Sequence, residues 1–448
     1  MTIRVKTSFG HLFMITAAFA AVVFICGCER KIPAPKTGYT KDSIPAQNIT
    51  GKPADMQMED PNDLSLMHGN EEGGSDVSEN RNNRSDASVD NRDSKQVSEN
   101  EKEQDISLIM AGDILLHIPV DRSCMLDDGS YDYSCIFENT RDDIEKADLA
   151  LVNQEVIIGG KELGVTGYPS FNAPFEIGDA LADSGFDVVC HATNHALDRG
   201  KTGIVNCLDY WNREHPDVAV IGINRTAEDR NDVYVYEKDG IRIAVLNYTY
   251  GTNGVKMPED MPFAVDLLKE DRVAEDLRQA EDIADFTIVC PHWGTEYNLG
   301  KTTDQDNWTD IFFENGADLV LGTHPHVIEP IEWIEDEQTG KKMLVYYSLG
   351  NYVNWTAGNG PGTSNRMVGG LALVNIGRDD TGEVVVKDYG VEAIVCHLTK
   401  EKQGITVYRL ADYDERLARS NEIVNQDPDF SRQYCVDLCN EVWGNKWE

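Results

Sequence analysis

The segment LVLGTHPH at residues 319–326 decides the fold class of this chain. A strand-like apolar run ends at Gly322, and two histidines, His324 and His326, follow on either side of a proline. An extended backbone step at the X-Pro dipeptide would let both imidazoles face neighbouring metal ions. The alternative is a tight turn that happens to contain two histidines. Segments elsewhere in the chain favour the first interpretation.

Five further segments repeat this arrangement of a metal-type ligand placed directly after a strand-like apolar run. A parallel α/β sheet gathers functional groups in the loops beyond the carboxyl ends of its strands, so the recurrence predicts one convergent site. Any one histidine alone could be a buried core residue, but the set together favours a site. The segments are Gly112-Asp113, Asn153-Gln154-Glu155, Asn194-His195, His292-Trp293-Gly294 and Ser348-Leu349-Gly350-Asn351.

The residue types in these segments indicate divalent metal ions as the cofactor. Neutral imidazole, amide oxygen and carboxylate are the ligands that manganese, zinc and iron accept. The chain has only ten histidines, and four of them fall in these segments. We therefore expect one or two ions of manganese, zinc or iron. Trp293 and Tyr297, beside His292, are as compatible with packing in the pocket wall as with substrate contact.

Net charge limits the possible partners. The formal charge of −38 opposes broad contact with nucleic acid or with an anionic lipid surface, because long-range repulsion acts against the encounter. No nucleic-acid partner is therefore expected. An anionic substrate would need a local source of positive charge, and bound metal ions would supply it.

The first residues resemble a bacterial lipoprotein signal peptide at residues 1–28. A basic start is followed by the apolar run Leu12 to Ile25, and Cys28 stands where a lipidated cysteine would become the mature N-terminus. The alternative is an uncleaved anchor helix. Both interpretations anchor the protein in the membrane and place its domain on the extracellular face of the cytoplasmic membrane.

Residues 29–104 are predicted to be a disordered acidic and polar tether. They are rich in Asn, Asp, Ser and Glu and show no apolar period, so they cannot bury enough surface to offset their ordering entropy. The folded domain is expected at residues 105–398. There, strands alternate with helices up to residue 327 and are then joined by turns, which predicts two packed sheets with helices outside.

Three expectations concern the periphery of this domain. Glycine-rich residues 356–365 are predicted to form a mobile loop, and residues 399–448 a helical, peripheral tail. Cys124 with Cys135, and Cys435 with Cys439, are the local disulfide candidates. Cys190 and Cys290 end core-like strands, where buried free thiols are expected.

Taken in order, the motifs resemble those of the CapA family, over about residues 105–398. That family comprises capsule and poly-γ-glutamate synthesis proteins built on the calcineurin-like metallophosphoesterase fold. The resemblance implies an α/β fold in the form of a four-layer α/β/β/α sandwich, with two mixed sheets and a two-metal centre at one sheet edge. It also implies an anionic polymer or a phosphoester as substrate, and a capsule-synthesis complex in the membrane as a possible partner.

The resemblance assigns a role to each motif residue. Asp113 and His326 would hold one metal ion, Asn194, His292 and His324 the other, and Glu155 would bridge them. His195 would stand outside the ligands and protonate a leaving group. This chain departs from the metallophosphoesterase pattern at Leu115, where those enzymes carry a histidine. The first ion is therefore expected to have fewer protein ligands. The residues expected to contact substrate are Trp293, Glu296, Ser348 and Asn351, with Arg199 as an anion contact suggested by its position alone.

Two functions follow from these observations. The first is a lipid-anchored, metal-dependent hydrolase of phosphoesters, either within capsule synthesis or unrelated to it. The second is a component of capsule assembly that binds or guides an anionic polymer, with any catalysis secondary. A third interpretation keeps the fold as a metal-free interaction domain.

Overall fold

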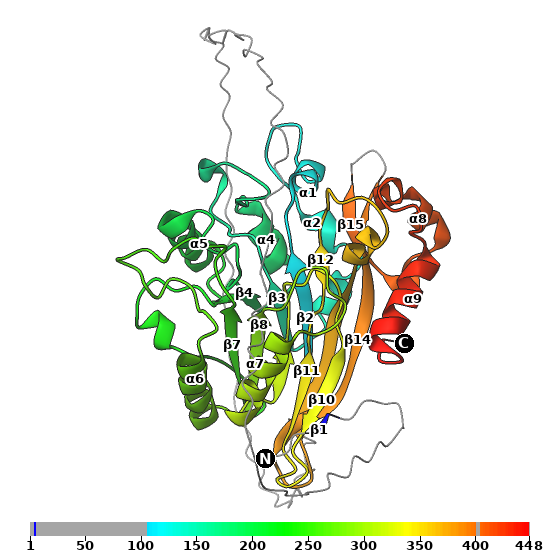
Figure 1. Cartoon of the computed structure of the whole chain (residues 1–448). Coiled ribbons are helices and arrows are strands. Elements are labelled where there is room, and N and C mark those ends of the chain that lie inside the picture. Colours follow the sequence, from blue (N-terminus) through cyan, green and yellow to red (C-terminus); the bar gives the residue numbers. More distant parts are fainter. Residues whose placement is uncertain (1–3, 6–104, 400–403, 448) are drawn as a thin grey trace, which may run out of the picture. The chain divides into compact units, whose positions relative to one another are not determined.

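The computed structural model describes residues 4–5, 105–399 and 404–447 (Figure 1). The expected signal peptide at 1–28, apart from Arg4–Val5, and the expected tether at 29–104 lie outside the described residues. Within the described residues, no helix has both the length and the apolar character needed to span a bilayer.

Two mixed sheets form the centre of the domain (Figure 1). In the seven-stranded sheet the order is β1 (Arg4–Val5), β10 (Ile331–Glu335), β11 (Lys342–Tyr346), β9 (Leu319–Leu321), β8 (Phe286–His292), β7 (Ile241–Thr249) and β6 (Tyr234–Lys238). In the eight-stranded sheet the order is β15 (Ile405–Arg409), β14 (Val384–Leu398), β13 (Val368–Arg378), β2 (Ile106–Ile114), β3 (Leu149–Asn153), β4 (Val188–Cys190) and β5 (Ala219–Ile221), with β12 (Asn351–Val353) paired to β2.

Parallel pairing joins four successive strands in each sheet. Strands β7, β8, β9 and β11 run parallel in one sheet, and β2, β3, β4 and β5 run parallel in the other. The remaining neighbours along the main strand order of each sheet pair antiparallel, including the hairpin β6–β7, whose turn contains Asp239-Gly240. Strand β12 pairs parallel to β2. Because parallel strands end at the same edge, the loops after β2, β3, β4, β8 and β9 are brought to one place.

Strand β8 shows how the sequence builds the layers. Alternate side chains of a strand point to opposite faces of the sheet. Ile288 and Cys290 face the core between the sheets, where the Cys290 thiol lies 3.9 Å from the sulfur of Met110 on β2. Val289 points the other way and packs in a second cluster with Val273 and Leu277.

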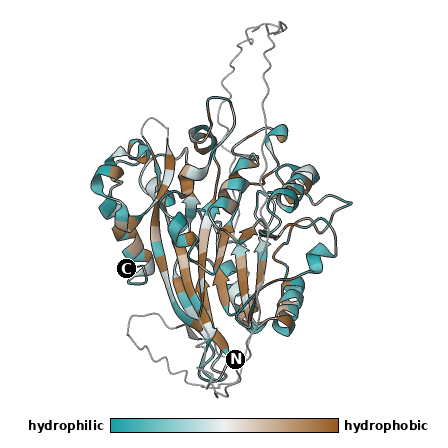
Figure 2. Cartoon of the chain, turned by 180° about the vertical axis from the view of Figure 1, so that it is seen from behind, coloured by the Kyte–Doolittle hydropathy of each residue, from teal (hydrophilic) through white to brown (hydrophobic). Residues whose placement is uncertain are grey.

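Helices cover the outer faces of both sheets, so the architecture is the expected α/β/β/α sandwich. Helices α6 (Glu270–Ile283) and α7 (Thr303–Glu314) pack on the seven-stranded sheet. The eight-stranded sheet is flanked by α2 (Ser134–Phe137), α4 (Glu176–Asp183), α5 (Gly200–Glu214) and α9 (Arg432–Trp443). Figure 2 shows apolar residues along the strands and hydrophilic residues on the outer helices.

The last fifty residues differ from the expectation of a helical, peripheral tail. They contain α8 (Glu415–Ser420) and α9, but they begin with β15, which extends the sheet beside β14. Trp443 is buried and donates its indole N–H to the carbonyl of Glu329 at 3.0 Å. Apolar residues alternate along residues 405–409, and this period of two fits a β-strand better than a helix.

The cysteines are free thiols in the described part of the chain, so neither expected disulfide is present. Cys435 and Cys439 lie one turn apart on α9, and both side chains pack into the apolar core. Cys124 is buried and Cys135 is half-buried, and both are free thiols. Cys190 and Cys290 are buried free thiols, as expected.

Candidate metal centre

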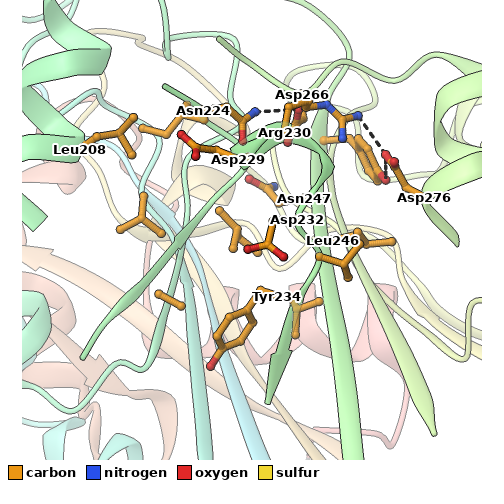
Figure 3. A pocket seen from close by; sticks show the side chains of 18 of the residues that line it. Leu208, Asn224, Asp229, Arg230, Asp232, Tyr234, Leu246, Asn247, Asp266 and Asp276 are labelled. Atoms are coloured by element: carbon orange, nitrogen blue, oxygen red, sulfur yellow. Dashed lines mark hydrogen bonds and ion pairs between the residues drawn. The ribbon is translucent and has the colours of Figure 1, made fainter. Parts of the chain in front are cut away.

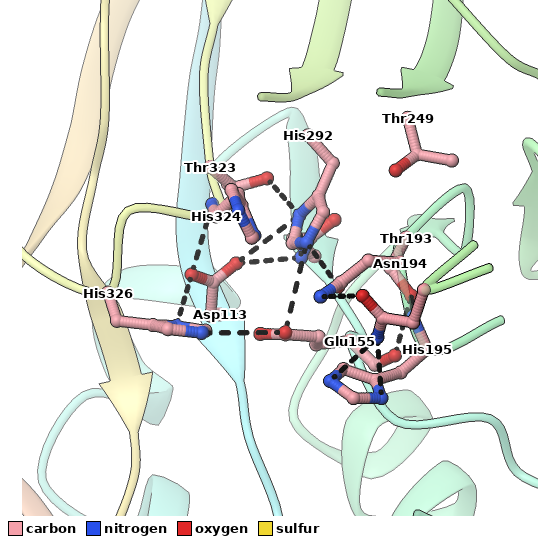
Figure 4. A network of polar contacts seen from close by, with 12 residues as sticks. Asp113, Glu155, Thr193, Asn194, His195, Thr249, His292, Thr323, His324 and His326 are labelled. Atoms are coloured by element: carbon pink, nitrogen blue, oxygen red, sulfur yellow. Dashed lines mark hydrogen bonds and ion pairs between the residues drawn. The ribbon is translucent and has the colours of Figure 1, made fainter. Parts of the chain in front are cut away.

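The candidate ligands come from five strand ends, three in one sheet and two in the other. Asp113 is the second-to-last residue of β2, Glu155 follows β3, and Asn194 follows β4. His292 is the final residue of β8, and His324 and His326 follow β9. Figure 4 shows these side chains pointing toward one another where the two sheets meet. All six are buried, with 5% exposure at most.

Two ligand groups overlap at Glu155. Glu155, His292 and His324 form one group, and Asp113, Glu155 and His326 form the other, with ligand atoms within 4.8 Å of one another in each group. The Glu155 Oε1 atom lies 3.8 Å from His292 Nε2 and 3.6 Å from His326 Nε2. The amide oxygen of Asn194 lies 3.0 Å from His292 Nε2. This geometry suits two cations that share one carboxylate.

Three ligand atoms of this cluster lack hydrogen-bond partners among the described residues, which fits a metal-binding site. Both carboxylate oxygens of Glu155 and Nδ1 of His324 are buried without a hydrogen-bond partner among the described residues. A buried polar group without a partner costs about 1–3 kcal/mol, and more when it is charged. Divalent cations would satisfy these atoms.

Burial also prepares the imidazoles for ligation. Burial lowers the pKa of His292 and of His324 well below the ordinary value for histidine, and the neighbouring histidines lower both further. Both rings are therefore neutral, which is the form that binds metal. Burial raises the pKa of Glu155 well above its ordinary range. A cation at this carboxylate would reverse that effect by favouring the charged form.

The backbone of the histidine segment is strained and does not make the extended step predicted for it. His324 has φ 101° and His326 has φ 58°, both in the region that favours glycine. Such a conformation costs about 1–3 kcal/mol per residue and persists only where surrounding contacts impose it. The carboxylate of Asp113 accepts from the His324 amide at 3.2 Å, and the Tyr297 amide donates to the carbonyl of Pro325 at 2.7 Å.

Three neutral side chains orient the ligands. Asn153 donates to Asp113 Oδ1 at 2.8 Å, and the hydroxyl of Thr323 lies 3.0 Å from His292 Nδ1. Asn351 accepts from His326 Nδ1 at 3.1 Å and donates to the His326 carbonyl at 2.9 Å. Nε2 of His326 is the ring atom that faces Glu155, at 3.6 Å from its Oε1 atom. Asn351, expected at the pocket floor, thus positions His326.

His195 lies beside the ligand groups and outside both. Its Nδ1 is 2.6 Å from the carboxylate of Asp198, and its ring packs edge-on against Phe171 with centroids 4.6 Å apart. Asp198 also accepts from the Phe171 amide at 2.7 Å, which fixes the carboxylate. The spacing of three residues between His195 and Asp198 is the sequence signal for this pair.

Of the residues expected to contact substrate, three make other contacts and a fourth is exposed. The hydroxyl of Ser348 donates to the Val327 carbonyl, and Trp293 is 1% exposed and donates its indole N–H to the Tyr347 carbonyl at 2.9 Å. The guanidinium of Arg199 hydrogen-bonds Thr166, both the side chain and the carbonyl of Ser170, and the Asp198 carbonyl, so it fixes a loop. Glu296 is exposed, and its charge contributes to raising the pKa of His326 to about 9, after the effects of Glu155 and Asp113.

A cavity of about 240 Å³ opens beside His326. Its walls include His117, Tyr168, Tyr297 and Arg366. A different cavity of about 580 Å³ lies along β5 and β7, and its lining residues include none of the candidate ligands (Figure 3). Arg230 in the wall of that second cavity is paired with Asp266 and Asp276.

The chain matches known capsule proteins in sequence. A family model described as "Bacterial capsule synthesis protein PGA_cap" matches residues 107–356. The PGA biosynthesis protein CapA of Bacillus subtilis (strain 168) is 30% identical over 190 residues, which cover 39% of this chain and 45% of that protein. The capsule biosynthesis protein CapA of Bacillus anthracis is 27% identical over 186 residues, which cover 40% and 43%. The chain therefore spans less than half the length of these curated relatives.

Solved structures with a similar arrangement of elements include nucleotidases. The 5′-nucleotidase precursor of Thermus thermophilus is 14% identical with a TM-score of 0.40, and the match covers 67% of this chain and 56% of that one. The NAD nucleotidase of Haemophilus influenzae is 11% identical with a TM-score of 0.41, covering 65% and 52%.

Proposed function

The chain belongs to the family of bacterial capsule synthesis proteins described as PGA_cap, and on that premise we propose that it acts in capsule synthesis as a metal-dependent hydrolase of the phosphoester type. The polymer we assign to it is poly-γ-glutamate or a related anionic chain. The observation that carries the hydrolase proposal is the pair of buried ligand groups that share Glu155.

Each residue of the site has a defined task in this proposal. Asp113, Glu155 and His326 would hold one divalent ion, and Glu155, Asn194, His292 and His324 the other. When bound, the ions supply positive charge for an anionic substrate and a hydroxide at neutral pH. Asp198 accepts a hydrogen bond from Nδ1 of His195 and orients the ring. When both ring nitrogens carry a proton, Nε2 would pass its proton to the departing oxygen and leave the neutral ring with its proton on Nδ1.

Two features support a metal centre rather than a metal-free interaction surface. The carboxylate oxygens of Glu155 are buried and have no hydrogen-bond partner among the described residues, which is costly for a protein that binds no cation there. The positive φ values of His324 and His326 are of the kind that cluster at functional sites. A domain that only bound a partner would need neither of them.

Metal analysis of the full chain tests this proposal. We expect manganese, zinc or iron in the wild type and a loss of most of it in His326→Ala and Asn194→Ala. His215→Ala, which removes a histidine at the end of α5, is the matched control and should keep the metal. A metal-free wild type would exclude the proposal.

Turnover separates the hydrolase from a polymer-guiding protein. The metal-loaded chain should hydrolyse bis(p-nitrophenyl) phosphate, and His195→Ala should lower the rate by about 10² to 10⁴-fold with metal content unchanged. A loaded protein that binds poly-γ-glutamate but hydrolyses no phosphodiester would instead support the guiding function.

We propose a cellular location separately from the catalytic function. The lipoprotein-like residues 1–28 support a lipid anchor on the extracellular face of the cytoplasmic membrane, within a capsule-synthesis complex. Labelling cells with a palmitate analogue should mark the wild type, and Cys28→Ser should abolish the label. Cys26→Ser is the matched control. Label retained in Cys28→Ser would contradict the anchor.

A further inference from the structure

Arg366 is a cationic side chain beside the metal centre that lacks an ionic partner in the contacts described for it. It lies in the short helix η3 (Thr363–Met367). Its Nε atom is buried and has no hydrogen-bond partner among the described residues. The guanidinium contacts neutral groups: the hydroxyl of Thr356 accepts from Nη1, and the ring of Tyr297 lies 3.6 Å from the guanidinium carbon.

The side chain of Asn351 ties Arg366 to a candidate metal ligand. Asn351 donates from Nδ2 to the Arg366 carbonyl at 3.0 Å, while its Oδ1 accepts from His326 Nδ1 at 3.1 Å. Two further bonds hold the segment, from the Ser364 amide to Asp427 at 3.1 Å and from the Tyr434 hydroxyl to Asn365. Arg366 and His326 are therefore held in a fixed relation, which lowers the entropy cost of binding a ligand across both.

The cavity of about 240 Å³ lies between these two groups, since both Arg366 and His326 line it. Tyr168 and Tyr297 also line it, and these residues are 77% and 46% exposed. The cavity therefore opens to solvent past two aromatic rings. Glu296, the acidic neighbour of Tyr297, is exposed, so solvent and salt screen its charge.

The guanidinium of Arg366, held in this position, is suited to binding an oxyanion. Its planar fork of donors matches a carboxylate or a phosphate, and charge-assisted hydrogen bonds of this type are about twice as strong as neutral ones. In a chain of net charge −38, a cation without a carboxylate beside it is available to a ligand. The stacked ring of Tyr297 holds the guanidinium plane without using its donors.

We propose that this cavity, the Arg366 pocket, binds a second oxyanion of the substrate, a carboxylate or a phosphate, while the first oxyanion lies at the metal centre. This inference rests on the proposed function, because it places the first oxyanion at the metals. It narrows the substrate class to molecules with two anionic groups a short distance apart. A phosphorylated chain end that carries a carboxylate fits this description, and so does a diphosphate.

Calorimetry on the manganese-loaded full chain tests the pocket with three probes. Methylphosphonate carries one oxyanion, 3-phosphonopropionate adds a carboxylate, and propane-1,3-diphosphonate adds a second phosphonate. We expect the wild type to bind at least one of the two larger probes about tenfold more tightly than methylphosphonate, the gain that one charge-assisted hydrogen bond supplies. The larger gain identifies the group that the pocket accepts.

The variants decide whether Arg366 is responsible. Arg366→Gln should lose the gain and keep the affinity for methylphosphonate, and Arg366→Lys, which keeps the charge, should retain part of the gain. Arg409→Gln is the matched control, since it removes an arginine from the edge strand β15, where Asp412 is its partner. Equal affinity for all three probes in the wild type, or a gain that survives in Arg366→Gln, overturns the proposal. Absence of metal from the wild type would instead overturn the proposed function.

Discussion

Replacing Glu329 with glutamine should stabilise the protein in a pH-dependent way. Glu329 lies three residues after His326, and its side chain is fully buried. One carboxylate oxygen accepts from Gln305 of α7 at 2.6 Å, and the other has no partner among the described residues. Burial raises the pKa of Glu329 from 4.5 to about 8, and the Gln305 bond opposes the rise only in part.

The size of the effect follows from the proton that folding takes up. Between pH 4.5 and 8 the folded protein holds a proton on Glu329 that the unfolded chain lacks, so stability falls by about 1.4 kcal/mol for each unit that the pH rises. At pH 7 the cost is about 3 kcal/mol. Glutamine resembles the protonated carboxyl in shape and needs no proton, so Glu329→Gln should recover most of that free energy.

Urea-induced unfolding, followed by tryptophan fluorescence from pH 5 to pH 8, measures this effect. The difference in unfolding free energy between variant and wild type should be under about 1 kcal/mol at pH 5 and about 3 kcal/mol at pH 7. Glu314→Gln, which removes an exposed carboxylate at the end of α7, is the matched control and should show no such trend. A difference that stays the same from pH 5 to pH 8 would refute the reasoning.

Three further predictions concern the metal centre. Asn351→Ala should weaken manganese binding by about 10- to 100-fold in a metal titration, because it releases the ring of His326; unchanged affinity would contradict its positioning role. Asp198→Asn should lower turnover of a phosphodiester by about 10²-fold or more at constant metal content, because His195 loses the carboxylate that orients its ring. A rate equal to that of the wild type would show that Asp198 does not position His195. Manganese at about 100 times its dissociation constant should raise the unfolding free energy by about 2.7 kcal/mol relative to protein from which a chelator has removed the metal. A melting temperature that does not change when the chelator is added would argue against metal binding at Glu155.

The positions of the candidate ligands along the chain were predictable from sequence because they depend on local pattern. Each follows an apolar run, and the end of such a run fixes where the next loop begins. Parallel pairing then brings the loops together without further information from the side chains. The backbone at His324 was not predictable in this way, since its positive φ is imposed by Asp113, more than two hundred residues earlier.

The two arginines show where sequence proximity misleads. Arg199 follows the Asn194-His195 motif closely, yet its guanidinium hydrogen-bonds residues of the 166–170 loop. Arg366 directly follows the glycine-rich residues that were predicted to form a mobile loop, and the sequence around it shows no apolar periodicity that would predict its position. Its position depends on contacts with residues 427 and 434, which follow it by about 60 residues or more. Contacts between residues so far apart in the sequence produce no periodic pattern from which they could be predicted.

The strand and helix that close the domain have a practical consequence for shortened versions of the protein. Gln426 donates to the carbonyls of Thr356 and Gly358, and Trp443 reaches the backbone beside the histidine segment. A recombinant fragment cut at residue 398 would leave the long strand β14 as a bare, unprotected edge and detach the wall that carries Arg366. Such a fragment would be prone to aggregate, and its lack of activity would say nothing about the intact protein.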